Sequence, residues 1–146
     1  MIARTTIALA LVLSIAKPFI GAQTPNSKEA ALSAAETEAV NRAIATLHSE
    51  SDRKVAGEFS NAKKVAEMLC RPAATAYWKK KTPGVDRVFL GTSDPHTLVL
   101  ESDRRLTGTG QYRTPKGWTD FAFVCSLDPA KGTVTSFEAT PDSEAR

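Results

Sequence analysis

Apolar residues in the first half of the chain recur at three- and four-residue spacing. From Lys28 to Glu50 they form one stripe, made of Leu32, Ala35, Ala39, Val40, Ala43, Ile44 and Leu47. This spacing predicts an amphipathic helix, for which Asn26 or Ser27 is a suitable N-cap. Because alanine supplies much of the stripe, its burial gains little free energy, and we expect this helix to dock weakly.

Two further helices are expected before the chain changes character. A polar break at 49–57 precedes a second helical stretch, which begins near Ser60 and ends at Cys70. Pro72 suits the first turn of a third, shorter helix, because the N–H that proline lacks has no partner there. That helix continues to Lys80, where the cations of a lysine run interact favourably with the helix dipole.

After residue 84 the apolar period becomes two residues, which indicates β-strands. The expected strands are 85–90, 97–101, 106–113, 118–127 and 133–139. Phe121, Phe123, Cys125 and Leu127 share one face of the fourth strand, and Thr135, Phe137 and Ala139 share one face of the fifth. Strands bounded by turns and preceded by helices predict an α+β fold, with N-terminal helices packed on a four- to five-stranded antiparallel meander sheet.

Residues 1–22 have the three parts of a secretory signal peptide. Arg4 supplies the basic part, 7–16 is apolar, and Ala22 is a small residue suited to the cleavage site. An uncleaved membrane anchor is the alternative, but a spanning helix needs about 20 apolar residues, and Lys17 interrupts the run. We therefore expect a periplasmic or secreted protein, cleaved after Ala22, with no stable membrane span remaining.

The leader also changes the interpretation of charge and domain organisation. Of the 19 basic residues, Arg4 and Lys17 lie in the leader, which has no acid, so the formal charge falls from +3 to +1 on cleavage. A nearly neutral chain lacks the concentrated basic face that nucleic-acid binding requires. The remainder divides into a helical N-terminal extension with a polar linker at 23–59, a small α+β domain at 60–140 and a polar tail at 141–146.

The chain has two cysteines, Cys70 and Cys125. An even number of cysteines in an exported chain favours a disulfide, here joining the second helical stretch to the fourth strand; two buried free thiols are the alternative. A metal site is less favoured, because there is no Cys-x-x-Cys spacing and His48 and His96 are isolated. No metal and no cofactor is expected.

One combination of side chains has the composition of a binding surface. Tyr112, Arg113 and Trp118 flank the turn at 114–117, and aromatic and arginine side chains anchor interfaces. The alternative is a cross-strand pair that only covers the end of the sheet. We assign no catalytic residue, since Asp94-Pro95-His96 has the composition of a turn and no activated nucleophile is evident.

Several short motifs, in order, resemble one known family. They are Cys70, Pro-Gly-Val-Asp-Arg-Val at 83–88, Gly-Gln-Tyr-Arg at 110–113, Gly117-Trp118, Phe-Val-Cys at 123–125 and Val-Thr-Ser-Phe at 134–137. Over roughly residues 66–139 the chain resembles the bacterial exported domain of unknown function, family DUF nine-thirty. The resemblance implies an exported, disulfide-containing module and no particular activity. The family's usual Trp-Tyr pair is replaced by Trp118-Thr119, and the helix at 28–50 has no counterpart in it.

The sequence thus favours a small exported protein that acts as a non-enzymatic binding or envelope-accessory module, with a protein or glycan of the cell envelope as its partner. An inhibitor or accessory protein of a cell-wall-active enzyme is the second hypothesis. A small hydrolase with an unrecognised site is the third.

Overall fold

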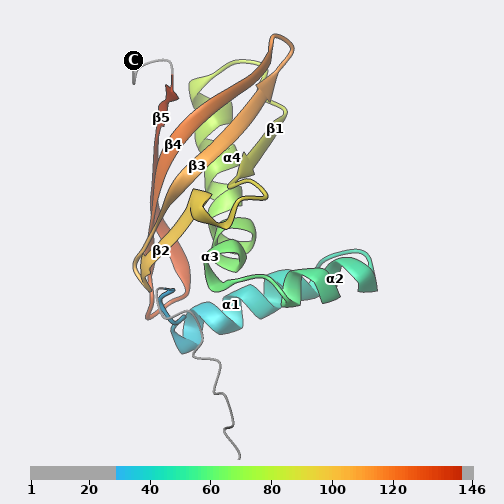
Figure 1. Cartoon of the computed structure of the whole chain (residues 1–146), viewed down its shortest axis with the longest axis vertical. Coiled ribbons are helices and arrows are strands. Elements are labelled where there is room, and N and C mark those ends of the chain that lie inside the picture. The colour runs from blue at the N-terminus through green and yellow to red at the C-terminus, as the bar shows by residue number, and fades with distance from the viewer. Residues whose placement is uncertain (1–28, 143–146) are drawn as a thin grey trace, which may run out of the picture.

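Helices fill the first part of the chain and strands the second, and they form two layers (Figure 1). The computed structural model describes residues 29–142. Its helical elements are α1 (Ala34–Ala45), α2 (Glu50–Gly57), α3 (Asn61–Lys64), the π-helical η1 (Val65–Cys70), α4 (Arg71–Lys81) and the short 3-10 turn η2 (Pro95–Thr97). Its strands are β1 (Arg87–Leu90), β2 (Leu98–Ser102), β3 (Arg105–Thr114), β4 (Gly117–Asp128) and β5 (Thr133–Pro141). The α+β prediction is confirmed.

The single helix expected at 28–50 is wrong in both its start and its length. Ser33 begins α1, because its hydroxyl accepts a hydrogen bond from the N–H of Glu36 while the Glu36 carboxylate accepts one from the N–H of Ser33. Asn26 and Ser27, the expected caps, lie outside the described residues. The expected polar break at 49–57 is itself helical, since Ser49 caps α2 and acidic residues occupy its first turn.

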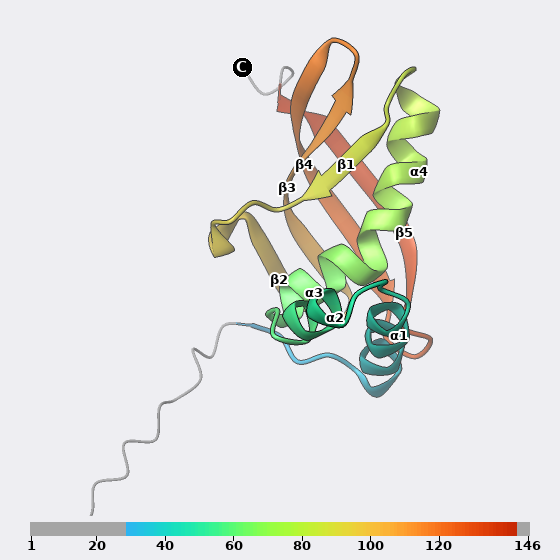
Figure 2. The ribbon, with the colours of Figure 1, turned by 90° about the vertical axis from the view of Figure 1, so that its right-hand side faces the viewer.

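The next three helical elements follow one another without a break. The chain passes from α3 through η1 into α4, with Pro72 in the first turn of α4 and three lysines in its last turn, as predicted. The π-helical turn ends at Cys70, so the disulfide joins the sheet at the middle of this helical rod. Figure 2 shows α4 lying along one face of the sheet, while α1 and α2 lie at one end of it.

The sheet is antiparallel, with the strand order β1-β3-β4-β5. The first two strands do not pair with each other: β1 pairs with residues 110–113 of β3 and β2 with residues 105–108. The Asp94 side chain accepts a hydrogen bond from the N–H of His96, and this turn interrupts one strand line instead of reversing it. The two expected strands therefore lie end to end along the same edge of β3.

The predicted inward face of β5 is wrong at one residue. A register shift lies between Ser126 and Leu127 of β4, so Val134 rather than Thr135 pairs with Leu127. Val134 packs on the core with Phe137, whereas Thr135 is exposed. A β-bulge of this kind inserts one residue and changes which side chains face inward, which a strict period of two does not predict.

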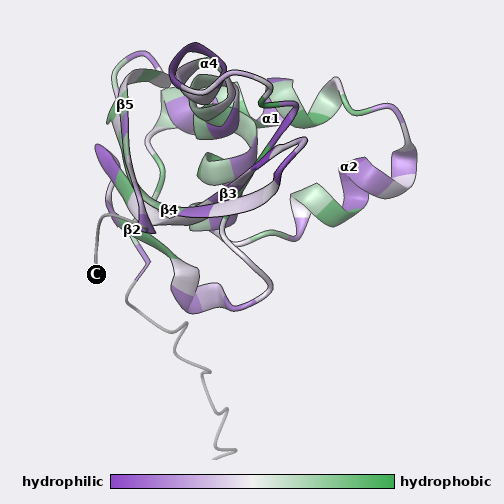
Figure 3. Ribbon diagram, turned by 90° about the horizontal axis from the view of Figure 1, so that it is seen from above, coloured by the Kyte–Doolittle hydropathy of each residue, from purple (hydrophilic) through white to green (hydrophobic). Residues whose placement is uncertain are grey.

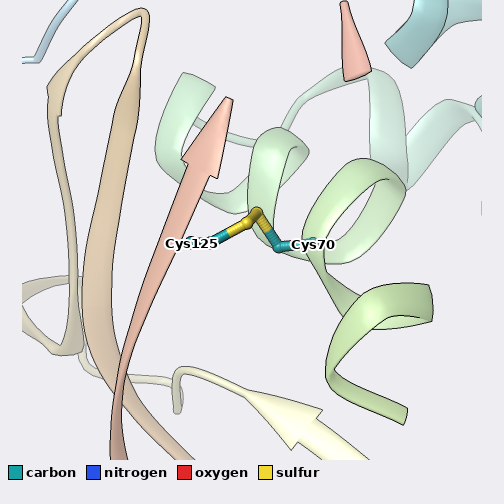
Figure 4. Close-up of a disulfide and its surroundings, with 2 residues drawn as sticks. All are labelled: Cys70 and Cys125. Atoms are coloured by element: carbon teal, nitrogen blue, oxygen red, sulfur yellow. A yellow bond between two sulfur atoms is a disulfide. The ribbon is translucent and has the colours of Figure 1, made fainter. Parts of the chain in front are cut away.

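The disulfide between Cys70 and Cys125 is present, which confirms that prediction (Figure 4). Both cysteines are fully buried between the helical layer and β4. Around them the interior is rich in aromatic rings: the Trp78 ring centroid lies 4.4 Å from that of Tyr112 and 5.0 Å from that of Phe121. Viewed along the sheet, the strands curve around this helical layer (Figure 3).

The first helix docks on the turn between β4 and β5. The Ser33 hydroxyl donates a hydrogen bond to the carbonyl of Pro129 at 2.7 Å, and Val40 is 2 % exposed. A Cβ atom at Gly132 would lie 2.4 Å from the carbonyl oxygen of Ala35, so glycine lets the two segments approach closely. We expected this helix to dock weakly, because its apolar stripe is rich in alanine. In the structure its N-terminal end is held against the turn between β4 and β5.

No helix between residues 29 and 142 is long and apolar enough to cross a membrane. The predicted signal peptide at 1–22 lies outside the described residues.

Candidate binding surface

The helices cover one face of the sheet, and the other face is open (Figure 2). Arg113 of β3 and Trp118 of β4 are direct cross-strand partners on this open face. The Arg113 guanidinium carbon lies 5.6 Å from the centroid of the Trp118 ring, over its face. Trp118 nevertheless remains 46 % exposed, which leaves a large apolar area available to a partner.

The third residue of the predicted surface, Tyr112, does not belong to it. Adjacent residues of a strand point to opposite faces, so Tyr112 faces the helices while Arg113 faces outward. Tyr112 is buried against Trp78 and Phe121. The Tyr112 side chain therefore packs in the core and is not part of the surface.

Two residues from other elements complete the surface. The Phe89 ring of β1 stacks on Trp118, with centroids 5.6 Å apart and an interplanar angle of 21°. The Arg71 guanidinium, from the first turn of α4, lies over the Phe89 ring with its carbon 5.2 Å from the centroid. We call Arg71, Phe89, Arg113 and Trp118 the aromatic–arginine cluster. Phe89 is the middle residue of the apolar run Val88-Phe89-Leu90. The period of two in this strand places Phe89 on the opposite face from Val88 and Leu90, and this was the only feature of the sequence that could have identified Phe89 as a surface residue.

Each arginine of the cluster is fixed by a carboxylate. Arg113 donates to both carboxylate oxygens of Asp86, at 3.0 and 2.6 Å, and Arg71 donates to Glu67 at 2.8 Å. The hydrogen bond from Arg113 lowers the pKa of Asp86, and the same carboxylate raises the pKa of Arg113. Paired guanidinium groups lose less conformational freedom when a partner binds, so the cluster is preorganised.

The edge of the sheet next to this cluster is closed by side chains. Glu67 also pairs with Lys63 at 2.8 Å. Lys63 and Arg71 each donate a hydrogen bond to a β1 carbonyl that points away from β3, at the free edge of the sheet. Lys63 donates to Leu90 at 3.1 Å and Arg71 to Val88 at 3.1 Å. Because these carbonyls are occupied, β1 is a poor template for an added strand. This region therefore presents side chains of the open face, and not a free strand edge, to its surroundings.

One cavity brings together a serine, a histidine and a carboxylate. Ser60, His96 and Glu29 line a hollow of about 470 Å³ beside β2. The Ser60 hydroxyl accepts a hydrogen bond from the N–H of Lys63, and Glu29 accepts one from the N–H of Ala62. Both groups thus serve the start of the α3 helix, and within residues 29–142 neither is hydrogen-bonded to the His96 ring. This arrangement lacks the oriented base that nucleophilic catalysis requires.

Metal-ligating side chains are dispersed. Over the described range 29–142, no group of three or more His, Cys, Asp or Glu residues is placed to hold a metal ion.

Comparison with known proteins adds no relative: no family model, no curated protein and no solved structure matches the chain. The resemblance to the DUF nine-thirty family therefore stays a prediction.

Proposed function

We propose that this chain is an exported, non-enzymatic binding module that captures a component of the cell envelope through its aromatic–arginine cluster. The observation that carries the proposal is the stacked pair of Phe89 and Trp118, which stays 36 % and 46 % exposed in the midst of two anchored arginines. Exposed aromatic side chains beside fixed arginines have the composition of interface hot spots.

The exposure of the pair has a free-energy cost that folding alone does not explain. An interior position would remove most of the apolar area of both rings from water, at a gain of about 25 cal/mol per Å². On the same open face Thr109 and Asp120 are polar, and Val99 of β2 is a second exposed apolar site, away from the cluster. Two salt-bridged arginines contact the rings of this pair, and the rings stay exposed to water. Their exposure is therefore better explained by contact with a partner than by a contribution to the stability of the fold.

Export is supported by the leader and by the disulfide. Disulfides persist in oxidising compartments such as the periplasm and the extracellular medium, and Cys70–Cys125 is formed in the structure. The test is mass spectrometry of the protein recovered from a bacterial host: we expect a mature N-terminus at Gln23 in the periplasmic or extracellular fraction. Recovery of the uncleaved chain in the cytosol would contradict export.

Binding is tested by site-specific crosslinking. We place a photoreactive p-benzoylphenylalanine at Lys116, in the exposed turn beside Trp118, and irradiate the protein with native envelope material. We expect discrete crosslinked products that disappear in the variant Trp118→Ala/Arg113→Ala. The matched control is Val99→Ala, which removes another exposed apolar side chain, 49 % exposed, from β2. Crosslinks that persist in the double variant, or that the control also abolishes, would refute a binding role for the cluster.

A further inference from the structure

Cationic side chains from separate elements meet at one end of the molecule. The last turn of α4 and the β3–β4 hairpin lie at this end, as Figures 1 and 2 show from two directions. The connection from α4 to β1 touches the hairpin, because a Cβ atom at Gly84 would lie 3.2 Å from Cδ of Pro115. The cations at this end are Lys79, Lys80, Lys81, Arg87, Arg113 and Lys116. We call these six residues the basic end.

Few acidic residues balance the basic end. Asp86 and Asp120 lie in or beside the strands here, and Asp142 follows the end of β5. Asp86 is occupied by Arg113, and Asp120 accepts a hydrogen bond from Gln111. Among residues 29–142, three carboxylates against six cations leave a local excess of three positive charges. The net charge of +1 expected for the mature chain therefore hides a strongly asymmetric distribution.

Most of the basic end is available to a partner. Within the described part of the chain, only Arg113 of the six cations forms an ion pair. The three lysines of α4 are exposed. Trp118 lies close to this end, on the open face of the sheet one residue after the hairpin turn, and indole side chains are enriched at membrane interfaces.

We infer that the basic end docks the protein on an anionic phospholipid surface, with Trp118 entering the headgroup layer. The inference rests on the proposed function and names the envelope component that the cluster captures. The three lysines of α4 and Lys116 of the hairpin turn place point charges on two separate elements of this end. Juxtamembrane cations each contribute to attraction by anionic lipid, and an exposed aromatic ring adds apolar burial.

The experiment measures binding of the mature chain to vesicles. Intrinsic fluorescence suits it, because the chain has two tryptophans and Trp78 is only 3 % exposed, so a spectral shift reports on Trp118. We expect a blue shift with phosphatidylcholine vesicles containing phosphatidylglycerol, none with pure phosphatidylcholine, and loss of binding when the NaCl concentration rises to about 0.5 M.

A charge-matched pair of triple variants locates the contact. Lys79→Gln/Lys80→Gln/Lys81→Gln should weaken partitioning about a hundredfold, at about fivefold for each cation. The control, Lys54→Gln/Arg104→Gln/Lys131→Gln, removes three exposed cations from elsewhere on the surface and should bind like the wild type. In the wild-type background, Trp118→Ala should also weaken binding to the vesicles, and it should abolish the spectral shift.

Two results would overturn the lipid inference. One is equal loss of binding in both triple variants, which would mean that overall charge and not the basic end is responsible. The other is absence of vesicle binding together with tight binding to a soluble polyanion such as dextran sulfate. If vesicles fail to bind while the crosslinks from Lys116 still depend on Trp118, the proposed function stands and only its lipid partner is refuted.

Discussion

Removal of the disulfide should cost a large share of the stability of this chain. The perturbation is Cys70→Ala/Cys125→Ala, which opens a covalent loop between residues 55 apart in sequence. In the chain-entropy model, closing a loop of this length lowers the entropy of the unfolded state by about 14 cal/mol/K. At 25 °C this corresponds to about 4 kcal/mol of folding free energy.

The packing of the two sulfur atoms adds to this loss. Both cysteines are fully buried, so alanine leaves a small cavity worth about 1 kcal/mol in total. Natural domains have unfolding free energies of about 5–15 kcal/mol, so the double variant should be barely stable. For a domain of this size we expect the thermal midpoint to fall by about 15–20 °C.

Urea unfolding followed by circular dichroism measures the effect. The wild type under reducing conditions separates the two contributions, because both sulfur atoms stay in place and only the loop constraint is lost. Reduced wild type should lose about 4 kcal/mol and unfold with a larger denaturant slope, since its unfolded chain is more expanded. Equal stability of the reduced and oxidised proteins, with full reduction verified by thiol titration, would refute the reasoning.

Three further tests, two of them with a matched control substitution, address the packing and the electrostatics. Glu67→Ala should lower the unfolding free energy by about 2 kcal/mol, because it strands two half-buried cations, whereas Glu38→Ala removes only an exposed pair and should cost less than about 0.5 kcal/mol; urea unfolding compares them. Gly132→Ala should destabilise by about 2 kcal/mol, since residue 132 has φ +65° and faces a backbone oxygen. Gly57→Ala, in open helical surroundings, should be neutral or stabilise by up to about 1 kcal/mol in the same assay. The pKa of Asp86 lies below its ordinary value of 3.8 in the folded chain, so its contribution is complete above that pH and is lost as the pH falls through the folded-state pKa. Thermal midpoints of Asp86→Asn and wild type should therefore converge in strong acid, and a constant difference at every pH would contradict the assignment.

The strands were predictable because their apolar alternation is a local property. Phe121, Phe123 and Cys125 face the helices, as their period of two requires, and turn residues marked the strand ends. The order of the strands in the sheet, by contrast, is not a local property. That β1 and β2 share one edge of β3 depends on the turn at Asp94, whose effect on strand direction is a matter of backbone geometry and not of composition.

The N-terminal helices show a different limit. One apolar stripe crossed residues 28–50 without interruption, so the sequence predicted one helix. In the structure the helix within this range, α1, covers only Ala34–Ala45, and a second helix begins at Glu50 in the expected polar break, because Ser33 and Ser49 each accept hydrogen bonds from N–H groups at the start of a helix. Capping competes with periodicity, and a short polar segment with serine followed by acids favours a new helix start.

Half of the candidate surface could be found from sequence and half could not. Arg113 and Trp118 are joined by a short turn, so their pairing follows from the hairpin alone. Phe89 and Arg71 reach them only through the β1–β3 register and the position of α4, which are tertiary features. Tyr112 was misassigned because it was grouped with its neighbours by composition, although the alternation of strand residues already separates it from Arg113.

The closed edge of β1 and the aromatic–arginine cluster depend on the same carboxylate, Glu67. An open sheet face with exposed aromatic rings promotes association unless the neighbouring edge is closed. Glu67 holds the Arg71 side chain, which both occupies an outward carbonyl of β1 and covers the Phe89 ring. Loss of Glu67 should therefore open the edge and loosen the cluster together. A conservative Arg71→Lys change should retain charge at the edge but lose the planar contact with Phe89, so it should spare solubility while weakening partner binding. An equal loss of solubility and of partner binding in Arg71→Lys would contradict this expectation, because it would mean that the edge and the cluster cannot be perturbed separately.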